Sequence, residues 1–423
     1  MKKIYFVGIK GTGMSGLAII YKKLGYNVVG SDVDKYFFTQ DSLLKNNIKF
    51  YKGFSLDNLK KEMPIDFLVT SNAWLNNKET LWAKEKGIKV LNYPQAVASI
   101  FNKSFGIAIC GTHGKSTTTA FLGKIFQIAN LKTIVLVGSP VKDWESNVYF
   151  SGKDYFILEA DEYRGAFLSY KPKIIILTSL DYDHPDFFKT KKEYKEIFIK
   201  FFKNLTGPRI LISYSKFNLP KEIKQIKIKY NPKIKFNFYA PGNHWQKNLQ
   251  LLFKFSKIFE KNFRVKNFTK SFFESTKTFG GVKRRFEILN QNPVLVDDYA
   301  HHPKELICFY KSLKIKFKNK KIFLIFQPHT YSRTEALFKD FKKVFRKIEN
   351  LILFKTFTSA RESENKEIEK KIRQLKKEIK LKYFDDKVKL IKFLKNKLKK
   401  FKNIVIATAG AGDIYEILKK LKS

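Results

Sequence analysis

Short apolar runs alternate with helix-like segments along the whole chain, and this alternation limits the possible folds more than any other feature. Seven runs have the length and apolar content of buried strands: KKIYFVGI, FGIAICG, YFILEADE, KIIILTSLD, PVLVDDY, KIFLIFQ and NIVIATAG. Each ends at or beside a cluster of Gly, Asp or His residues. Strands that alternate with helices predict parallel sheets with crossover helices, whose ligands bind beyond the carboxyl ends of the strands.

The length of the chain, 423 residues, predicts two or three domains, because a single hydrophobic core stops growing at about 250–300 residues. Strand-to-glycine turns occur near Gly8, Gly111 and Gly410, which indicates more than one sheet. The alternation is interrupted near residues 102–106 and 278–283, so we place candidate domain boundaries there.

The charge, the apolar runs and the cysteine count indicate which partners and which cellular compartment to expect. The net charge of +45 would suit nucleic-acid or anionic-membrane binding, but the lysines are spread through most of the chain, which favours compositional drift. We therefore expect no nucleic-acid partner. No apolar run approaches the roughly 18 residues of a membrane helix, so no membrane insertion is expected. Two cysteines, Cys110 and Cys308, cannot build a disulfide framework, which favours the reducing cytoplasm.

A glycine-rich turn follows the first predicted strand. Gly11-x-Gly13-x-x-Gly16 fits the dinucleotide fingerprint, in which the backbone approaches a diphosphate at a helix N-terminus. Asp32 ends a second predicted strand, where an acid can bind a ribose hydroxyl. Taken alone, the turn would fit an NAD-dependent dehydrogenase, another nucleotide diphosphate site or a tight turn without a ligand.

A phosphate loop follows the strand FGIAIC. The segment 110–119 reads CGTHGKSTTT, with Ile109 where a full Walker A loop has its first glycine. Its backbone N–H groups and the following helix N-terminus suit phosphates, and Lys115 can reach the β- and γ-phosphates. The Ser116 hydroxyl can bind Mg²⁺. The alternative is a glycine-containing turn with an exposed lysine.

Acidic residues and a histidine follow the next two predicted strands. Glu159, Asp161 and Glu162 come after one strand, and Asp181, Asp183, His184 and Asp186 come after the other. Neighbouring strand ends lie at one edge of a parallel sheet, so these side chains can hold Mg²⁺ against a triphosphate. Singly, each acid would also fit a helix cap or a solvated turn.

These segments together resemble the Mur ligases, in the same order and over nearly the whole chain. GIKGTGMSGLA resembles the family's N-terminal UDP-binding turn, and GTHGKSTTT resembles its shortened phosphate loop. EADEYRGAFLSYKP and DYDHPDFF resemble its metal-binding segments, and APGNHWQKN its adenine-side segment. GGVKRRFE, VDDYAHHPKE, FQPHTYSRT and ATAGAGDIYE resemble its C-terminal domain.

The resemblance implies an α/β fold of three domains. Residues 1–104 would form a Rossmann-like UDP-sugar-binding domain, and residues 105–280 a central P-loop ATPase-like domain with a mostly parallel sheet that binds ATP. Residues 281–423 would form a Rossmann-like amino-acid-binding domain. The implied reaction is ATP- and Mg²⁺-dependent ligation of L-alanine to UDP-N-acetylmuramic acid through an acyl phosphate, the first amino-acid addition in peptidoglycan precursor synthesis.

The resemblance also implies roles for individual residues. The ATP site would comprise Gly111, Thr112, His113, Gly114, Lys115, Ser116, Thr117, Asn248 near the adenine and Asp298 near the ribose. The metal ligands would be Ser116, Glu159 and His184. The UDP-sugar site would comprise Gly11, Gly13, Ser31, Asp32 and Ser71. The amino-acid side would comprise Tyr299, His301 and Arg333, and the catalytic residues would be Lys115, His301 and Arg333, with Arg284 and Arg285 able to reach phosphate or carboxylate.

Some positions depart from the family pattern, and other functions remain open. Trp245 stands where Asn is usual, Phe54 where His is common and Thr330 where some relatives have Arg, and residues 205–240 look shortened. YPQAV at 93–97 and EADEY at 159–163 are similar to the recycling ligase that attaches a tripeptide to UDP-N-acetylmuramic acid, whereas FQPHTYSRT favours alanine addition. The alternatives of other classes are a nicotinamide oxidoreductase and a basic nucleic-acid-binding ATPase.

Overall fold

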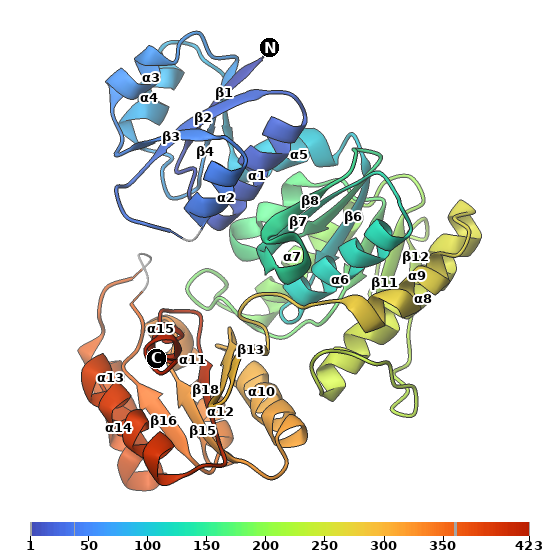
Figure 1. Ribbon diagram of the computed structural model, residues 1–423. Helices are drawn as coiled ribbons and strands as arrows, with labels where there is room; N and C mark the ends of the chain where they lie inside the picture. The colour runs from blue at the N-terminus through green and yellow to red at the C-terminus, as the bar shows by residue number, and fades with distance from the viewer. Residues whose placement is uncertain (1, 38, 359–361, 423) are drawn as a thin grey trace. The chain divides into compact units, whose positions relative to one another are not determined.

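The chain folds into three β-sheets whose strands alternate with helices along the sequence (Figure 1). The computed structural model describes residues 2–37, 39–358 and 362–422. All seven apolar runs are strands, and the predicted α/β class with mostly parallel sheets is confirmed. The described chain divides into two compact units, one of residues 1–180, 195–237 and 248–282, the other of residues 181–194, 238–247 and 283–423.

The first sheet has five parallel strands in the order β3-β2-β1-β4-β5. The strands are β1 (Lys3–Val7), β2 (Asn27–Asp32), β3 (Lys49–Lys52), β4 (Phe67–Thr70) and β5 (Val90–Asn92). The helices are α1 (Thr12–Lys23), α2 (Thr39–Lys45), α3 (Leu56–Lys61), α4 (Lys78–Glu85) and α5 (Tyr93–Phe101). β1 and β4 are almost wholly buried because helices cover both faces of a parallel sheet, which explains their unbroken apolar sequences.

The second sheet has seven strands in the order β12-β11-β10-β6-β9-β7-β8. The strands are β6 (Phe105–Cys110), β7 (Thr133–Val141), β8 (Ser146–Phe150), β9 (Tyr155–Glu159), β10 (Ile174–Leu177), β11 (Ile210–Ser213) and β12 (Lys224–Lys227). The helices are α6 (Lys115–Ile128), η1 (Lys142–Trp144), η2 (Tyr163–Ser169), α7 (Lys191–Lys203), α8 (Asn243–Phe263) and α9 (Phe268–Thr278). Only the edge strand β8 runs antiparallel, so the ends of β6, β9 and β10 meet at one edge.

The third sheet has six strands in the order β13-β14-β18-β15-β16-β17, of which only β13 is antiparallel. The strands are β13 (Glu287–Gln291), β14 (Val294–Asp298), β15 (Lys321–Phe326), β16 (Leu351–Phe354), β17 (Leu381–Phe384) and β18 (Ile404–Ala409). The helices are α10 (Pro303–Lys316), α11 (Tyr331–Ala336), α12 (Phe338–Phe345), α13 (Lys366–Glu378), α14 (Lys387–Lys400) and α15 (Glu416–Lys419).

Helices α13 and α14 are rich in lysine. Ile368, Ile372 and Leu375 are buried along α13, and Leu390 and Leu394 along α14, while most lysines of both helices face solvent. An apolar stripe with solvated lysines is what amphipathic surface helices require. Among the described helices, none is long and apolar enough to span a bilayer.

Helix α1 packs on the β7–β8 hairpin of the second sheet, within the first unit. Asn147 of β8 is buried and donates to Thr12 O at 2.8 Å and to Val137 O at 3.3 Å. Gly16 makes this approach possible, because a Cβ there would lie 2.6 Å from both Asn147 Nδ2 and Leu136 Cδ1. The third glycine of the fingerprint therefore serves close packing of α1 against the hairpin.

Replacing Gly16 by alanine should therefore destabilise the first unit by about 1–3 kcal/mol, as overpacked positions typically do. The matched control is Gly11→Ala, because Gly11 has φ −57° and a Cβ there would be 3.5 Å from its nearest neighbour. That control should leave the free energy of unfolding unchanged or raise it by at most about 1 kcal/mol. Denaturant unfolding measures both, and equal stabilities of the two variants would contradict the packing role.

Candidate active site

The phosphate loop joins β6 to α6 in a conformation that requires glycine. Gly111 has φ 128° and Gly114 has φ 80°, both in the region that side chains disfavour. A Cβ at Gly111 would lie 2.4 Å from Thr178 Oγ1, and one at Gly114 would lie 2.4 Å from Asn248 Nδ2. Thr178, just after β10, and Asn248, in the first turns of α8, therefore pack closely against the loop. Asn248 thus lies beside the loop residues with which it was predicted to bind ATP.

Residues after β10 also hold the loop by hydrogen bonds. Thr112 N donates to Ser179 O at 3.1 Å, and His113 N donates to Ser179 Oγ at 2.8 Å. Thr178 Oγ1 donates to His113 O at 2.7 Å, and Thr117 is buried in the first turn of α6. These hydrogen bonds hold the predicted loop residues in one conformation, as a preorganised phosphate site requires.

Lys115, the first residue of α6, is held inside the loop. Its Nζ donates to Gly111 O at 2.7 Å and to Glu162 Oε2 at 2.9 Å, and the Glu162 side chain is fully buried. Burial would lower the pKa of Lys115, but Glu162, Asp161 and Glu159 raise it above its usual value. Lys115 is therefore a permanent cation at the N-terminus of α6, where phosphate oxygens are stabilised.

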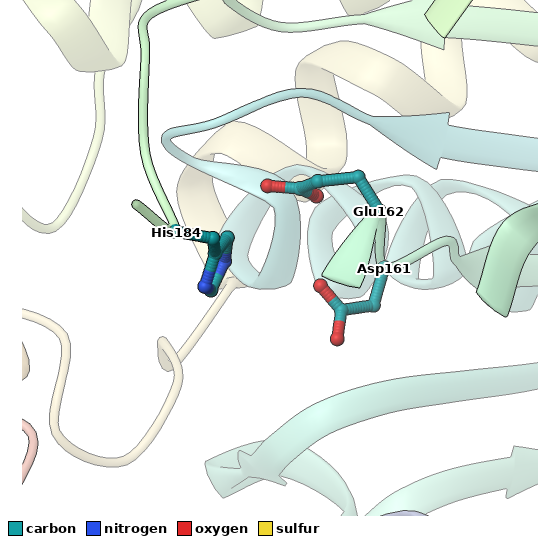
Figure 2. A group of neighbouring side chains, drawn as sticks. All are labelled: Asp161, Glu162 and His184. Atoms are coloured by element: carbon teal, nitrogen blue, oxygen red, sulfur yellow. The ribbon is translucent and has the colours of Figure 1, made fainter. Parts of the chain in front are cut away.

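Two groups of possible metal ligands lie at this sheet edge. Ser116 Oγ donates to Glu159 Oε1 at 2.8 Å, which brings together two of the three predicted ligands. The third, His184, offers a ligand atom within 4.8 Å of ligand atoms of Asp161 and Glu162 (Figure 2). Asp161 and Glu162 are among the acids after β9 that the sequence suggested for Mg²⁺, although the ligand set implied by the family resemblance named only Glu159 of these three.

Arg333, in α11, forms a buried ion pair with Asp183. Arg333 Nε lies 2.8 Å from Asp183 Oδ1 and Nη2 lies 3.5 Å from Oδ2, and the two side chains are 7% and 6% exposed. Nη1 donates to His329 O at 3.2 Å. Burial opposes ionisation of Asp183, but Arg333, His184 and His301 hold its pKa well below the usual range. One edge of the Arg333 guanidinium, which was predicted for the amino-acid side of the site, is thus occupied by an internal carboxylate.

His301 precedes α10 and lies beside this ion pair. Its Nδ1 is 3.0 Å from Tyr299 O, and the Tyr299 and His301 rings are 5.4 Å apart. Burial lowers the pKa of His301 to about 4, with Glu305 opposing and Arg333 reinforcing the shift. The three residues predicted for the amino-acid side, Tyr299, His301 and Arg333, therefore lie in one region of the second unit.

Arg284 and Asp298 form hydrogen bonds with neighbouring residues of the third sheet and its loops. Arg284 Nε lies 3.0 Å from Asp297 Oδ2, and its Nη atoms donate to Gly412 O and Gly410 O. The Asp298 oxygens accept bonds from Phe286 N and Ala300 N, and burial raises its pKa to about 7. Arg284 therefore joins β14 to the loop after β18, and its reach to phosphate or carboxylate stays a prediction.

In the first unit, two side chains predicted for the UDP-sugar site, Asp32 and Ser31, have internal partners. The Asp32 oxygens accept Lys10 N at 2.6 Å and Val33 N at 2.8 Å, and Ser31 Oγ donates to Glu79 at 2.5 Å. Ser71 N donates to Val7 O at 3.1 Å, directly beside the turn. Gly11 begins α1 as its N-cap, and a Cβ at Gly13 would lie 2.7 Å from the Tyr93 ring.

Two buried charged residues that the sequence did not predict for this site, Lys10 and Glu79, contact Asp32 and Ser31. Lys10 is 2% exposed, and its Nζ donates to Val33 O at 2.5 Å and Lys35 O at 2.6 Å. Glu79 is fully buried and also accepts Tyr5 Oη and Ser55 N. A lysine between Gly8 and Gly11 was the signal for the first, whereas nothing local marked Glu79, because its partners come from three distant segments.

Comparison with known proteins places these features in a family. Three domain descriptions match consecutive parts of the chain: "Mur ligase family, catalytic domain" at residues 3–104, "Mur ligase middle domain" at 109–276 and "Mur ligase, glutamate ligase domain" at 284–412. The UDP-N-acetylmuramate–L-alanine ligase of Borreliella burgdorferi is 35% identical over 463 residues, which cover 98% of this chain and 97% of that protein. The enzyme of the same name from Desulfitobacterium hafniense is 33% identical over 392 residues, covering 85% and 86%.

Solved structures share the fold. The UDP-N-acetylmuramate-alanine ligase of Thermotoga maritima superposes with a TM-score of 0.77 at 22% identity, covering 100% of this chain and 98% of that one. A murein peptide ligase from Psychrobacter arcticus gives a TM-score of 0.70 at 19% identity, with 100% and 98% covered. At these identities the two structures support the three-sheet architecture.

Proposed function

Because this chain belongs to the Mur ligase family, we propose that it joins L-alanine to UDP-N-acetylmuramic acid at the expense of ATP. The observation that carries the proposal is the 35% identity to the Borreliella burgdorferi ligase of that activity, over 98% of this chain. The reaction makes a precursor of peptidoglycan, and so of the cell wall. We assign it to the cytoplasm, where nucleotide-linked precursors and ATP are available.

Each domain would bind one substrate. Residues 1–104 would bind the UDP-sugar, residues 105–280 ATP and residues 281–423 L-alanine. The glycine-rich turn supports the first assignment, because Gly11 and Gly13 open α1 and a helix N-terminus favours a diphosphate. The loop around Lys115 supports the second. Asn248 would face the adenine from beside Gly114, and Asp298 would lie near the ribose.

The acidic edge of the second sheet would hold Mg²⁺. Carboxylate and hydroxyl oxygens are the ligands that Mg²⁺ prefers, and Ser116, Glu159, Asp161 and Glu162 supply them, with the His184 imidazole alongside. Bound Mg²⁺ would offset the negative charge of the ATP phosphates. The hydrogen bond between Ser116 and Glu159 already orients the hydroxyl at the start of α6.

The chemistry would proceed in two steps. The muramoyl carboxylate attacks the γ-phosphorus of ATP, giving an acyl phosphate and ADP, while Lys115 stabilises the charge on the transferring group. The amine of L-alanine then attacks the acyl carbon and phosphate leaves. Arg333 has Nε and one Nη2 hydrogen on Asp183 and its Nη1 on His329, so the alanine carboxylate would meet the second Nη2 hydrogen. Exclusion of water protects the acyl phosphate.

The test is phosphate release from ATP and Mg²⁺ with UDP-N-acetylmuramic acid, with and without L-alanine, with products identified by mass. Alanine-dependent release and a product heavier by one alanyl residue are expected. Turnover with a tripeptide but not with alanine would transfer the chain to the recycling ligases. No turnover with either amine would overturn the ligase proposal.

A further inference from the structure

The hydrogen bond of His301 determines which of its ring nitrogens carries the proton. Nδ1 lies 3.0 Å from Tyr299 O, and a carbonyl oxygen can only accept, so Nδ1 carries the hydrogen. In a neutral ring Nε2 then has a free lone pair. Within the part of the chain that the structure describes, Nε2 has no hydrogen-bond partner, and the side chain is 15% exposed. The ring therefore offers one accessible basic nitrogen.

The groups around His301 suit an acceptor of a proton. Glu305 of α10 approaches Nδ1 at 3.6 Å and also accepts the His301 backbone N–H at 3.1 Å. A carboxylate behind Nδ1 stabilises positive charge on the ring. Arg333 of α11 opposes that charge, whereas Asp183 supports it. The His329 ring lies 6.2 Å away.

From this geometry we infer that His301 Nε2 accepts the proton that the alanine nitrogen loses as the amide bond forms. The inference rests on the proposed ligase function. The free amine attacks the acyl carbon, the C–N bond forms, and one N–H proton of the attacking nitrogen passes to Nε2. The C–O bond to the phosphate breaks with its electron pair, and phosphate leaves. The imidazolium later returns its proton to solvent, so atoms and charge balance.

The low basicity of the His301 ring is consistent with proton transfer that occurs only as the C–N bond forms. With a pKa near 4, His301 stays neutral at physiological pH and keeps its lone pair available. A weak base cannot deprotonate free alanine, but an amine nitrogen becomes much more acidic once it bonds to the acyl carbon. Proton acceptance at that moment is general-base catalysis, which typically contributes about 10²–10⁴-fold.

The test compares two nucleophiles in wild type and His301→Gln. Hydroxylamine is a weakly basic nucleophile that traps acyl phosphates as hydroxamates and does not need a protein base. The variant should keep hydroxamate formation from UDP-N-acetylmuramic acid and ATP, which also shows that it folds. Its kcat with saturating L-alanine should fall about 10²–10⁴-fold. The matched control is His302→Asn, which keeps a side-chain acceptor at the N-cap of α10 and should ligate alanine normally.

The outcomes separate the inference from the function on which it rests. A kcat preserved at saturating alanine, with only KM raised, would make His301 a binding residue and overturn the inference. Equal losses with alanine and hydroxylamine would also overturn it, by placing the defect before the acyl phosphate. Absence of both hydroxamate and alanyl product in wild type would instead refute the ligase proposal itself.

Discussion

Replacement of Lys115 by methionine should lower kcat for alanine ligation by about a hundred- to a thousandfold, the usual loss when one preorganised charge-stabilising donor is removed. Lys115 is positively charged, only 14% exposed, and held by Gly111 O and Glu162 at the N-terminus of α6. Methionine fills a similar volume without the charge. Phosphate release in steady state measures the effect.

The matched control for this variant is Lys200→Met, which removes an exposed lysine from α7. It should keep full activity, so that the loss at Lys115 cannot be ascribed to net charge. Binding of UDP-N-acetylmuramic acid, measured by calorimetry, should persist in Lys115→Met and shows that the first unit is folded. Full ligation by Lys115→Met would refute the assignment of the phosphate loop.

The second large effect concerns the buried pair of Arg333 and Asp183. Arg333→Met or Asp183→Ala alone should each destabilise the second unit by about 3–5 kcal/mol, because either leaves a buried charge without its partner. The double variant should recover most of that stability, since neither charge then remains. The rate of alanine ligation by the double variant should stay low, because the guanidinium that would hold the alanine carboxylate is absent.

An exposed pair in the same unit provides the control. Arg373 and Asp385 are joined at 3.2 Å with side chains 51% and 48% exposed. Removing either should cost at most about 1 kcal/mol. Urea unfolding of the two sets of variants measures the difference. If single variants at both pairs lost the same free energy of unfolding, burial of Arg333 and Asp183 would not be what makes their ion pair important for stability.

The sequence predicted the strands and the phosphate loop because both are local patterns. An apolar run followed by glycine gives a strand and a turn whatever surrounds it, and Gly111 and Gly114 have the positive φ values that such a loop needs. The placement of Asn248 against Gly114 could be predicted only through the family resemblance, since the two residues are far apart in the sequence.

Pairings between distant residues could not be predicted from local patterns. Asp183 and Arg333 are 150 positions apart, and only the fold decides that this carboxylate occupies one edge of the guanidinium. Gly16 fitted a phosphate-binding fingerprint, but the packing partner that requires it is a hairpin more than 100 residues later. Lys10 interrupts an apolar stretch, yet backbone carbonyls make its burial tolerable.

The seating of α1 on the β7–β8 hairpin limits how this chain can be recombined with its relatives. A chimera joined near residue 104 would set a foreign helix against Leu136 and Asn147, which fit a residue without a side chain. Replacement of the first sheet by that of a relative would succeed only if the β7–β8 hairpin of the same relative were transferred with it. Selection would therefore keep the first two sheets together.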